Sequence, residues 1–139
     1  MKPVFQCLAS ALLYFITANS GAVELIANPE VPAENLTRSV VRSIFSMRMT
    51  SWPSGMPIRV FVLGDKNNLH ATFSKGILGV FPHQLRRAWN RQIFSGTGQA
   101  PEKVESEREM LDKVAHTPGA IGYISEEMIN EQIRTLAVE

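Results

Sequence analysis

The chain has 139 residues, with 14 Lys and Arg against 13 Asp and Glu and a formal net charge of +1. A charge so close to zero gives no support for a nucleic-acid partner or for binding to an acidic membrane surface. The one cysteine, Cys7, falls in the leader described next, so the remainder has no thiol for a disulfide, a nucleophile or a metal ligand.

The first 22 residues predict a signal peptide. Lys2 precedes a mostly apolar run of 13 residues, 4–16, and small residues follow up to Ala22. The run is too short for a bilayer-spanning helix, which needs about 20 apolar residues, but it suits an export signal. We expect cleavage after Ala22, or as second choice after Ser20; the alternative is a retained anchor or a buried N-terminal helix. The expected product, residues 23–139, is a single periplasmic domain of 117 residues without a membrane span.

The first half of this domain predicts a strand, a helix and a second strand. Residues 23–27 predict the first strand. Thr37 is expected to cap a helix that runs to about Ser46, a role that also accounts for the glycosylation sequon beginning at Asn35. The near-continuous apolar run 58–63 is typical of a strand covered on both faces. The expected inward-facing residues of the helix are Val40, Val41, Ile44 and Phe45.

Three helices are expected to follow. Apolar residues recur at helical spacing up to Gly79, and Pro82 opens a second helix. Ser106 and Glu109 form a capping box that starts the third. The expected inward-facing residues are Leu69, Phe73 and Ile77 in the first helix, Leu85, Trp89 and Ile93 in the second, and Met110, Leu111 and Val114 in the third.

The C-terminal part predicts two more strands. Gly119 is expected to turn the chain into a buried strand at 120–124. Gly122 lies inside that strand, and such a glycine usually marks a close approach by another backbone or a ligand. Residues 125–132 have weak helical signs, and 133–138 predict a closing edge strand. Strands and helices alternate, so the predicted fold class is α/β with a small, mostly parallel or mixed sheet.

No catalytic constellation stands out. The three histidines have no metal-ligand spacing, and no serine sits in a nucleophile-elbow pattern. Four glutamates between 102 and 109 are interpreted as complementing a helix dipole. The arginines around Trp89 are interpreted as a solvated face, and the glycine-rich turn at 95–98 lacks the lysine of a phosphate-binding loop. We therefore expect no enzymatic activity, cofactor or metal.

The junction after the strand 58–63 is the candidate site. It joins a buried strand to a helix start, where unpaired backbone N–H groups bind anions. The side chains of Asn67 and Asn68 would add donors, and His70 would add charge when protonated. The alternative is that Asn67 or Asn68 merely caps the helix. The candidate ligand-binding residues are Asp65, Asn67, Asn68, Leu69 and His70.

Several short motifs share their order and spacing with a known family. They are Ala27-Asn28-Pro29, Leu36-Thr37 through Ile44-Phe45, Trp52, residues 57–63, Phe73, Gln84-Leu85 with Trp89, Ile93-Phe94 with Gly96, and residues 118–124. Apart from the motifs between Gln84 and Gly96, they resemble in this order the second lobe of the phosphate-binding proteins that serve phosphate ABC transporters; the motifs between Gln84 and Gly96 resemble those of shorter relatives. More closely, the chain is similar to short, single-lobe exported proteins of that superfamily, over nearly all residues after the leader.

The resemblance implies one lobe of a type 2 periplasmic-binding-protein fold. It also implies solute binding, with phosphate or another oxyanion as ligand and an ABC transporter or a sensor protein as partner. Aligned on Phe73, this chain has Asn67, Asn68 and Leu69 where the family places Ser-Gly-Thr, and short relatives often have arginine at the position of His70. Since the hydroxyl groups and a second lobe are both missing, the expected binding of phosphate is weak.

A second hypothesis from a different class stays open. The domain would be a periplasmic accessory or interaction module with no small-molecule ligand. An open face near Trp52 or Trp89 would then meet another protein.

Overall fold

A computed structural model describes residues 22–96 and 98–139; the predicted leader, apart from Ala22, lies outside them. The strands are β1 (Val23–Ala27), β2 (Asn35–Leu36), β3 (Arg59–Val62), β4 (Glu102–Lys103), β5 (Ala120–Ser125), β6 (Arg134–Thr135) and β7 (Ala137–Val138). The α-helices are α1 (Arg38–Phe45), α2 (Asn68–Phe73), α3 (Pro82–Phe94) and α4 (Glu107–His116). A π-helical turn (Ser74–Leu78) continues α2, and a 3-10 helix (Glu126–Met128) follows β5.

The central sheet has five strands in the order β4-β3-β5-β1-β6. Strands β4, β3 and β5 are parallel, whereas β1 is antiparallel to both β5 and β6. The predicted α/β class with a mixed sheet is therefore confirmed. The carboxyl ends of β3, β4 and β5 meet at one edge of the sheet, and β1 begins there because Val23 lies opposite Ser125. We call this edge the rim.

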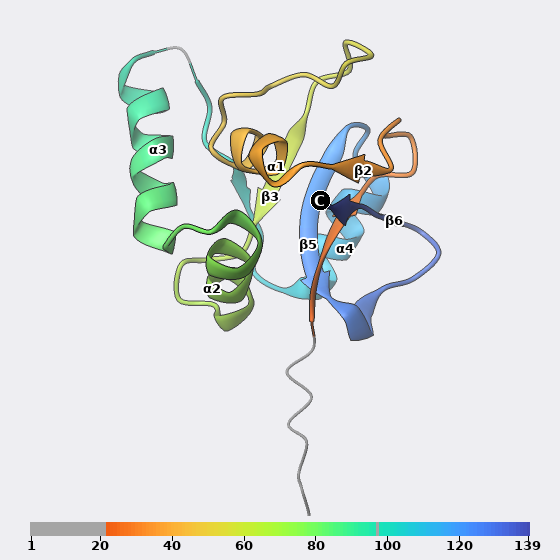
Figure 1. The fold of residues 1–139 in the computed structure, drawn as a ribbon. Coiled ribbons are helices and arrows are strands. Elements are labelled where there is room, and N and C mark those ends of the chain that lie inside the picture. Colours follow the sequence, from red (N-terminus) through yellow and green to blue (C-terminus); the bar gives the residue numbers. More distant parts are fainter. Residues whose placement is uncertain (1–21, 97) are drawn as a thin grey trace, which may run out of the picture.

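Helices cover both faces of the sheet (Figure 1). Successive side chains of a strand point to opposite faces, and Gly122 and Tyr123 show which helices lie on each. The Tyr123 ring stacks on Phe73 of α2 with centroids 3.9 Å apart. A Cβ atom on Gly122 would lie 2.5 Å from the Met110 sulfur and 3.1 Å from a Val114 methyl group, both on α4. The glycine thus admits helix side chains, and the expected approach of a ligand or another backbone was wrong.

The predicted caps at Thr37 and Ser106 and the predicted turn at Gly119 are confirmed, although the Glu109 side chain accepts from the Glu105 amide and so does not complete the expected capping box. The Thr37 hydroxyl accepts from the Val40 amide at the start of α1. The Ser106 hydroxyl accepts from the Glu109 amide at the start of α4. Gly119 has φ of 76° before β5, and a Cβ atom there would lie 2.1 Å from the Pro57 carbonyl oxygen. Each of these features depends on a few neighbouring residues, which is why the sequence predicts them.

The buried face of the helix after Asn67 differs from the prediction. The π-helical turn has more residues per turn than an α-helix, so the buried position beyond Phe73 moves from Ile77 to Leu78. Within α2, the contact with Tyr123 accounts for the burial of His70 in place of Leu69. His70, Ser74 and Leu78 are buried together with Phe73. Leu69 and Ile77, expected to face inward, are only partly buried.

Other differences lie at the edges of the molecule. Ile93 was expected inside but is 46% exposed, because the last turn of α3 lies at the outer edge (Figure 1). The short strands β2 and β4 were not predicted; β4 is polar and exposed, and its pairing with β3 defines it. The predicted edge strand 133–138 is divided, since Leu136 turns into the core between β6 and β7.

Candidate functional site

The loop from β3 to α2 forms part of the rim. Asn67 is the N-cap residue of α2, and its side-chain oxygen accepts from the amides of Leu69 at 2.8 Å and His70 at 3.3 Å. Asn68 is exposed in the first turn of the helix. The two amides that the sequence offered to an anion therefore already have an acceptor, and the capping alternative describes Asn67.

Asp65 forms an ion pair that the sequence analysis did not anticipate. The Arg86 Nε donates to Asp65 Oδ2 at 2.5 Å, although the two residues are 21 positions apart. This hydrogen bond is the main reason that the pKa of Asp65 lies below its usual value; the charges of Arg86 and Lys103 act in the same direction. Desolvation of the carboxyl partly opposes the shift.

A small cavity opens beside this ion pair. Its volume is about 180 Å³, and its lining includes Leu63, Gly64, Asp65, Arg86 and Lys103. It lies at the carboxyl ends of β3 and β4, where ligands bind in open α/β sheets. Two cationic side chains from different elements thus converge on the end of β3. We call this the rim cavity.

Lys103 was not singled out from the sequence. Its side chain folds over Gly64, where a Cβ atom would lie 3.3 Å from Lys103 Cε. The Lys103 ammonium lies 3.8 Å from a Glu105 carboxylate oxygen, in an exposed pair. Nothing in the sequence marks Lys103, because only the parallel pairing of β4 with β3 brings it to this place.

His70 lies in the core instead of at the surface. Its Nδ1 contacts the Tyr123 hydroxyl, which also accepts from the Leu63 amide at 2.8 Å. Burial lowers the pKa of His70, and the nearby Asp65 carboxylate only partly offsets this. Burial raises the pKa of Tyr123 above its usual value. His70 is therefore a neutral core residue and not the surface charge that the sequence suggested.

One polar atom of this cluster has no partner. Among the described residues, His70 Nε2 is buried without a hydrogen bond and lies 3.9 Å from Asp65 Oδ1. The carboxylate favours the tautomer with the proton on Nε2, and Tyr123 then donates to Nδ1. Unpartnered buried donors are rare, and here the Asp65 carboxylate is the nearby group that stabilises the N–H electrostatically.

The remaining acids at the rim have structural roles, as the sequence analysis expected. A Glu107 carboxylate oxygen accepts from the Ser125 amide at 2.7 Å and from its hydroxyl at 2.6 Å. Glu109 accepts from the Glu105 amide at 2.9 Å. Nowhere in the described part of the chain do three or more His, Cys, Asp or Glu side chains gather closely enough to hold a metal ion.

Neither tryptophan is available to a partner. Trp52 is 2% exposed and Trp89 is 6% exposed. Their indole N–H groups donate to the carbonyl oxygens of Gly119 at 3.0 Å and Phe45 at 2.6 Å, respectively. The expected open face near a tryptophan stays a prediction, since Trp89 lines the rim cavity although its ring is almost fully buried. Within residues 22–96 and 98–139, no helix has both the length and the apolar character needed to cross a bilayer.

A single α/β domain with an open rim at its strand ends is the architecture of one lobe of a ligand-binding clamshell. The chain matches the model of a family described as "PBP superfamily domain" over residues 17–138. It therefore belongs to this family. No curated protein shows a significant match.

Solved structures with the same fold are about twice as long. A putative phosphate ABC transporter substrate-binding protein with bound phosphate from Clostridium perfringens matches with a TM-score of 0.70 and 20% identity over 85% of this chain and 45% of its own. PstS from Borrelia burgdorferi matches with a TM-score of 0.67 and 20% identity, over 86% of this chain and 47% of its own. An ABC-type phosphate transport receptor from Vibrio cholerae matches with a TM-score of 0.65 and 18% identity, over 85% of this chain and 46% of its own. The chain thus spans less than half of these proteins, as one lobe does.

Proposed function

We propose that this chain is an exported, non-enzymatic solute-binding-type domain that binds an inorganic oxyanion, foremost phosphate, at the rim cavity. Membership of the PBP superfamily supports a binding role. The Clostridium perfringens structure with bound phosphate shares the fold and supports phosphate as the first ligand to test. An ABC transporter or a sensor protein in the periplasm would be the partner.

The observation that carries this proposal is the convergence of Arg86 and Lys103 on the end of β3. A guanidinium and an ammonium group beside one cavity attract a small anion. A bound oxyanion would compete with Asp65 for Arg86 and with Glu105 for Lys103.

This competition sets the expected affinity. A Kd of 1 µM corresponds to about 8 kcal/mol of binding free energy, and 1 mM to about 4 kcal/mol. Exposed charge interactions typically contribute about 1 kcal/mol or less each, and one lobe offers no second surface to close over the ligand. We therefore propose binding in the millimolar range for the isolated chain.

Calorimetric titration with phosphate and sulfate, at constant ionic strength, tests the proposal. Arg86→Gln and Lys103→Gln should each weaken binding several-fold, because each removes a cation from the cavity. Arg87→Gln is the matched control, since Arg87 is the exposed neighbour of Arg86 on α3 and does not line the rim cavity. No heat at about 10 mM ligand, or equal losses in Arg87→Gln and Arg86→Gln, would reject the rim cavity as the site.

Export has a separate test. Expression in a Gram-negative host should give a periplasmic product that begins at Val23, read by mass spectrometry. A product that keeps residues 1–22 and sediments with membranes would instead favour the retained anchor.

The second candidate is a periplasmic accessory module without a small ligand. The observation that favours this candidate is that hydrogen-bond donors at the rim already have acceptors within the chain. Asn67 accepts from an α2 amide, Asp65 accepts from Arg86, and Glu107 accepts from Ser125. These donors need no bound anion to complete their hydrogen bonds. Absence of phosphate and sulfate binding in the parent protein would favour this candidate.

A further inference from the structure

The near-zero net charge hides a strong separation of charge along the chain. Residues 35–101 contain nine Lys and Arg but one acid, Asp65. The other twelve acids lie in residues 22–34 and 102–139, which together contain four basic residues. Because whole-chain charge averages over both groups, it conceals a basic region and an acidic region.

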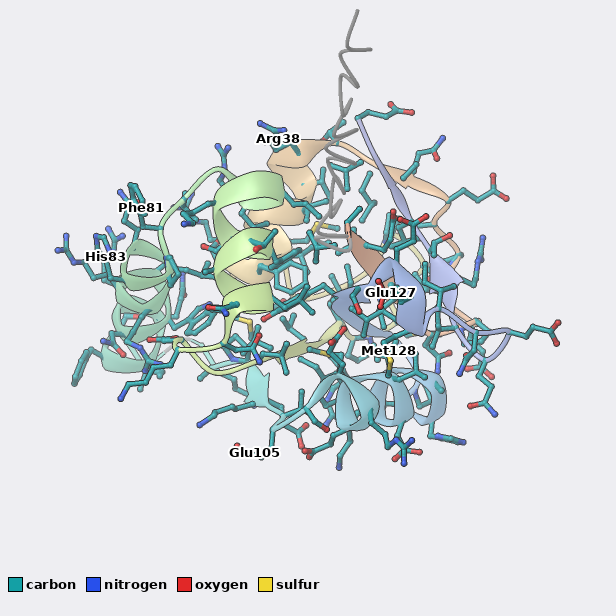
Figure 2. The ribbon with its side chains drawn as sticks, turned by 90° about the horizontal axis from the view of Figure 1, so that it is seen from below. Arg38, Phe81, His83, Glu105, Glu127 and Met128 are labelled. Atoms are coloured by element: carbon teal, nitrogen blue, oxygen red, sulfur yellow. The ribbon has the colours of Figure 1, made fainter. Side chains whose placement is uncertain are left out.

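The fold turns this separation into two faces. The basic segment supplies α1, α2 and α3, whereas the acidic segment supplies α4 and the 3-10 helix (Figure 1). Phe81 and His83 project from the α3 side of the molecule, away from Glu105 and Glu127 (Figure 2). The only acid of the basic segment, Asp65, is already paired with Arg86.

Two adjoining hollows lie between α1 and α3 on the basic face. The larger, about 170 Å³, has Arg42, Arg48 and Arg91 in its lining, and the smaller, about 130 Å³, shares Arg48 and Arg91. The Arg42 Nε donates to the Leu78 carbonyl at 2.9 Å, and a Cβ atom on Gly79 would lie 3.3 Å from its Nη2. The backbone at the end of the π-helical turn thus holds this guanidinium in place.

These arginines have no counter-charge in the described part of the chain. No carboxylate of residues 22–96 and 98–139 lies within 4.0 Å of Arg42, Arg48 or Arg91. Like charges around one hollow repel each other, and a bound anion relieves the repulsion. Every cationic side chain in the lining is arginine, whose planar fork binds carboxylates in bidentate fashion.

Large apolar side chains are exposed at both ends of α3, the helix that supplies Arg91. Phe94 is 87% exposed and Ile93 is 46% exposed at the end of α3, and Phe81 is 56% exposed at its start. Arginine and aromatic residues together are enriched at protein–protein interfaces. A bilayer is flat and would reach the convex side of α3, whereas a carboxylate on a protein segment can enter a hollow between two helices.

We propose that the arginine face, formed by Arg42, Arg48 and Arg91 together with Phe94 three positions beyond Arg91 on α3, docks an acidic segment of a partner protein. Glutamate or aspartate side chains of the partner enter the hollows between α1 and α3. An apolar residue of the same segment packs against Phe94. This site lies apart from the rim cavity and does not depend on phosphate binding.

Fluorescence anisotropy with a labelled peptide of glutamate and interspersed leucine tests this surface on the purified exported protein. The double variant Arg48→Gln/Arg91→Gln should weaken binding roughly tenfold or more, and Phe94→Ala should weaken it to a smaller extent. Arg48→Lys keeps the charge but loses the planar fork, so it should recover only part of the affinity. Added salt should weaken binding by the parent protein.

Two control variants establish whether the peptide binds at the arginine face. Arg108→Gln, on the exposed surface of α4, should leave peptide binding unchanged. Lys103→Gln should also leave it unchanged, while the double arginine variant should keep any phosphate binding at the rim. Peptide binding unaffected by the double variant would overturn the proposal. Tighter binding of phosphatidylglycerol vesicles, of duplex DNA or of a second copy of this chain than of the peptide would overturn it too.

Discussion

The Tyr123 hydroxyl is a buried polar group in the core that serves two hydrogen-bonding partners. It accepts from the Leu63 amide and contacts His70 Nδ1, and all three residues are buried. Tyr123→Phe removes the oxygen with little change in shape and leaves both partners unsatisfied. An unsatisfied buried polar group costs about 1–3 kcal/mol, so the variant should lose about 2–5 kcal/mol of unfolding free energy. That is a large part of the stability of a typical domain, about 5–15 kcal/mol.

Urea unfolding followed by circular dichroism measures this loss. A second variant, His70→Leu, makes the test specific. His70→Leu should cost less in the Tyr123→Phe background than in the parent, because only in the parent does it leave the tyrosine O–H donor without an acceptor. The coupling should reach about 0.5–3 kcal/mol. A loss below about 0.5 kcal/mol for Tyr123→Phe, or additive effects of the two changes, would refute the hydrogen-bonded cluster.

Three further predictions follow from single contacts. Since burial lowers the pKa of His70 below its ordinary value near 6.5, the unfolded state binds the proton more readily, and stability should fall as pH decreases below about 6.5. The slope from this residue is at most about 1.4 kcal/mol per pH unit; His70→Gln should flatten it, whereas a similar flattening in exposed His83→Gln would contradict the assignment. Gly122→Ala should cost about 1–3 kcal/mol in urea unfolding, with partial rescue by Met110→Val; no loss would mean that α4 packs less closely on β5. Asn67→Asp should keep the helix cap and thermal stability and weaken phosphate binding less than Arg86→Gln does, because Asn67 does not line the rim cavity; a larger loss than in Arg86→Gln would move the site to the start of α2.

The sequence predicts local features of this fold well. Thr37 and Ser106 cap helices through hydrogen bonds that span three residues, and Gly119 turns the chain where a side chain would strike the Pro57 carbonyl. The strands β1, β3 and β5 follow from their apolar runs. Such signals survive in the folded protein because they depend on few neighbours.

Features that depend on distant parts of the chain were missed. His70 follows a polar loop in the sequence, and this position suggests a surface residue. In the fold it is buried against Tyr123, which lies 53 positions away. Arg86 and Lys103 meet at the rim only because β4 pairs with β3 and α3 packs beside them. The π-helical turn rotated the apolar stripe of its helix, which a fixed spacing of 3.6 residues cannot anticipate.

The arginine face differs from both cases. Its charge pattern is visible in the sequence as a long segment with a single acid, Asp65, but a whole-chain charge count hides it. The hollows and the missing carboxylate partners are visible only in the fold.

We propose that an oxyanion binds at the carboxyl ends of the strands. Two-dimensional ¹H–¹⁵N NMR of the labelled protein during a phosphate titration tests it most directly. We predict saturable shifts of the amides of residues 63–70 and of the Arg86 side-chain Nε–H, together with the amides around Lys103. A spectrum that stays unchanged at those positions, or shifts confined to Arg42, Arg48 and Arg91, would contradict it.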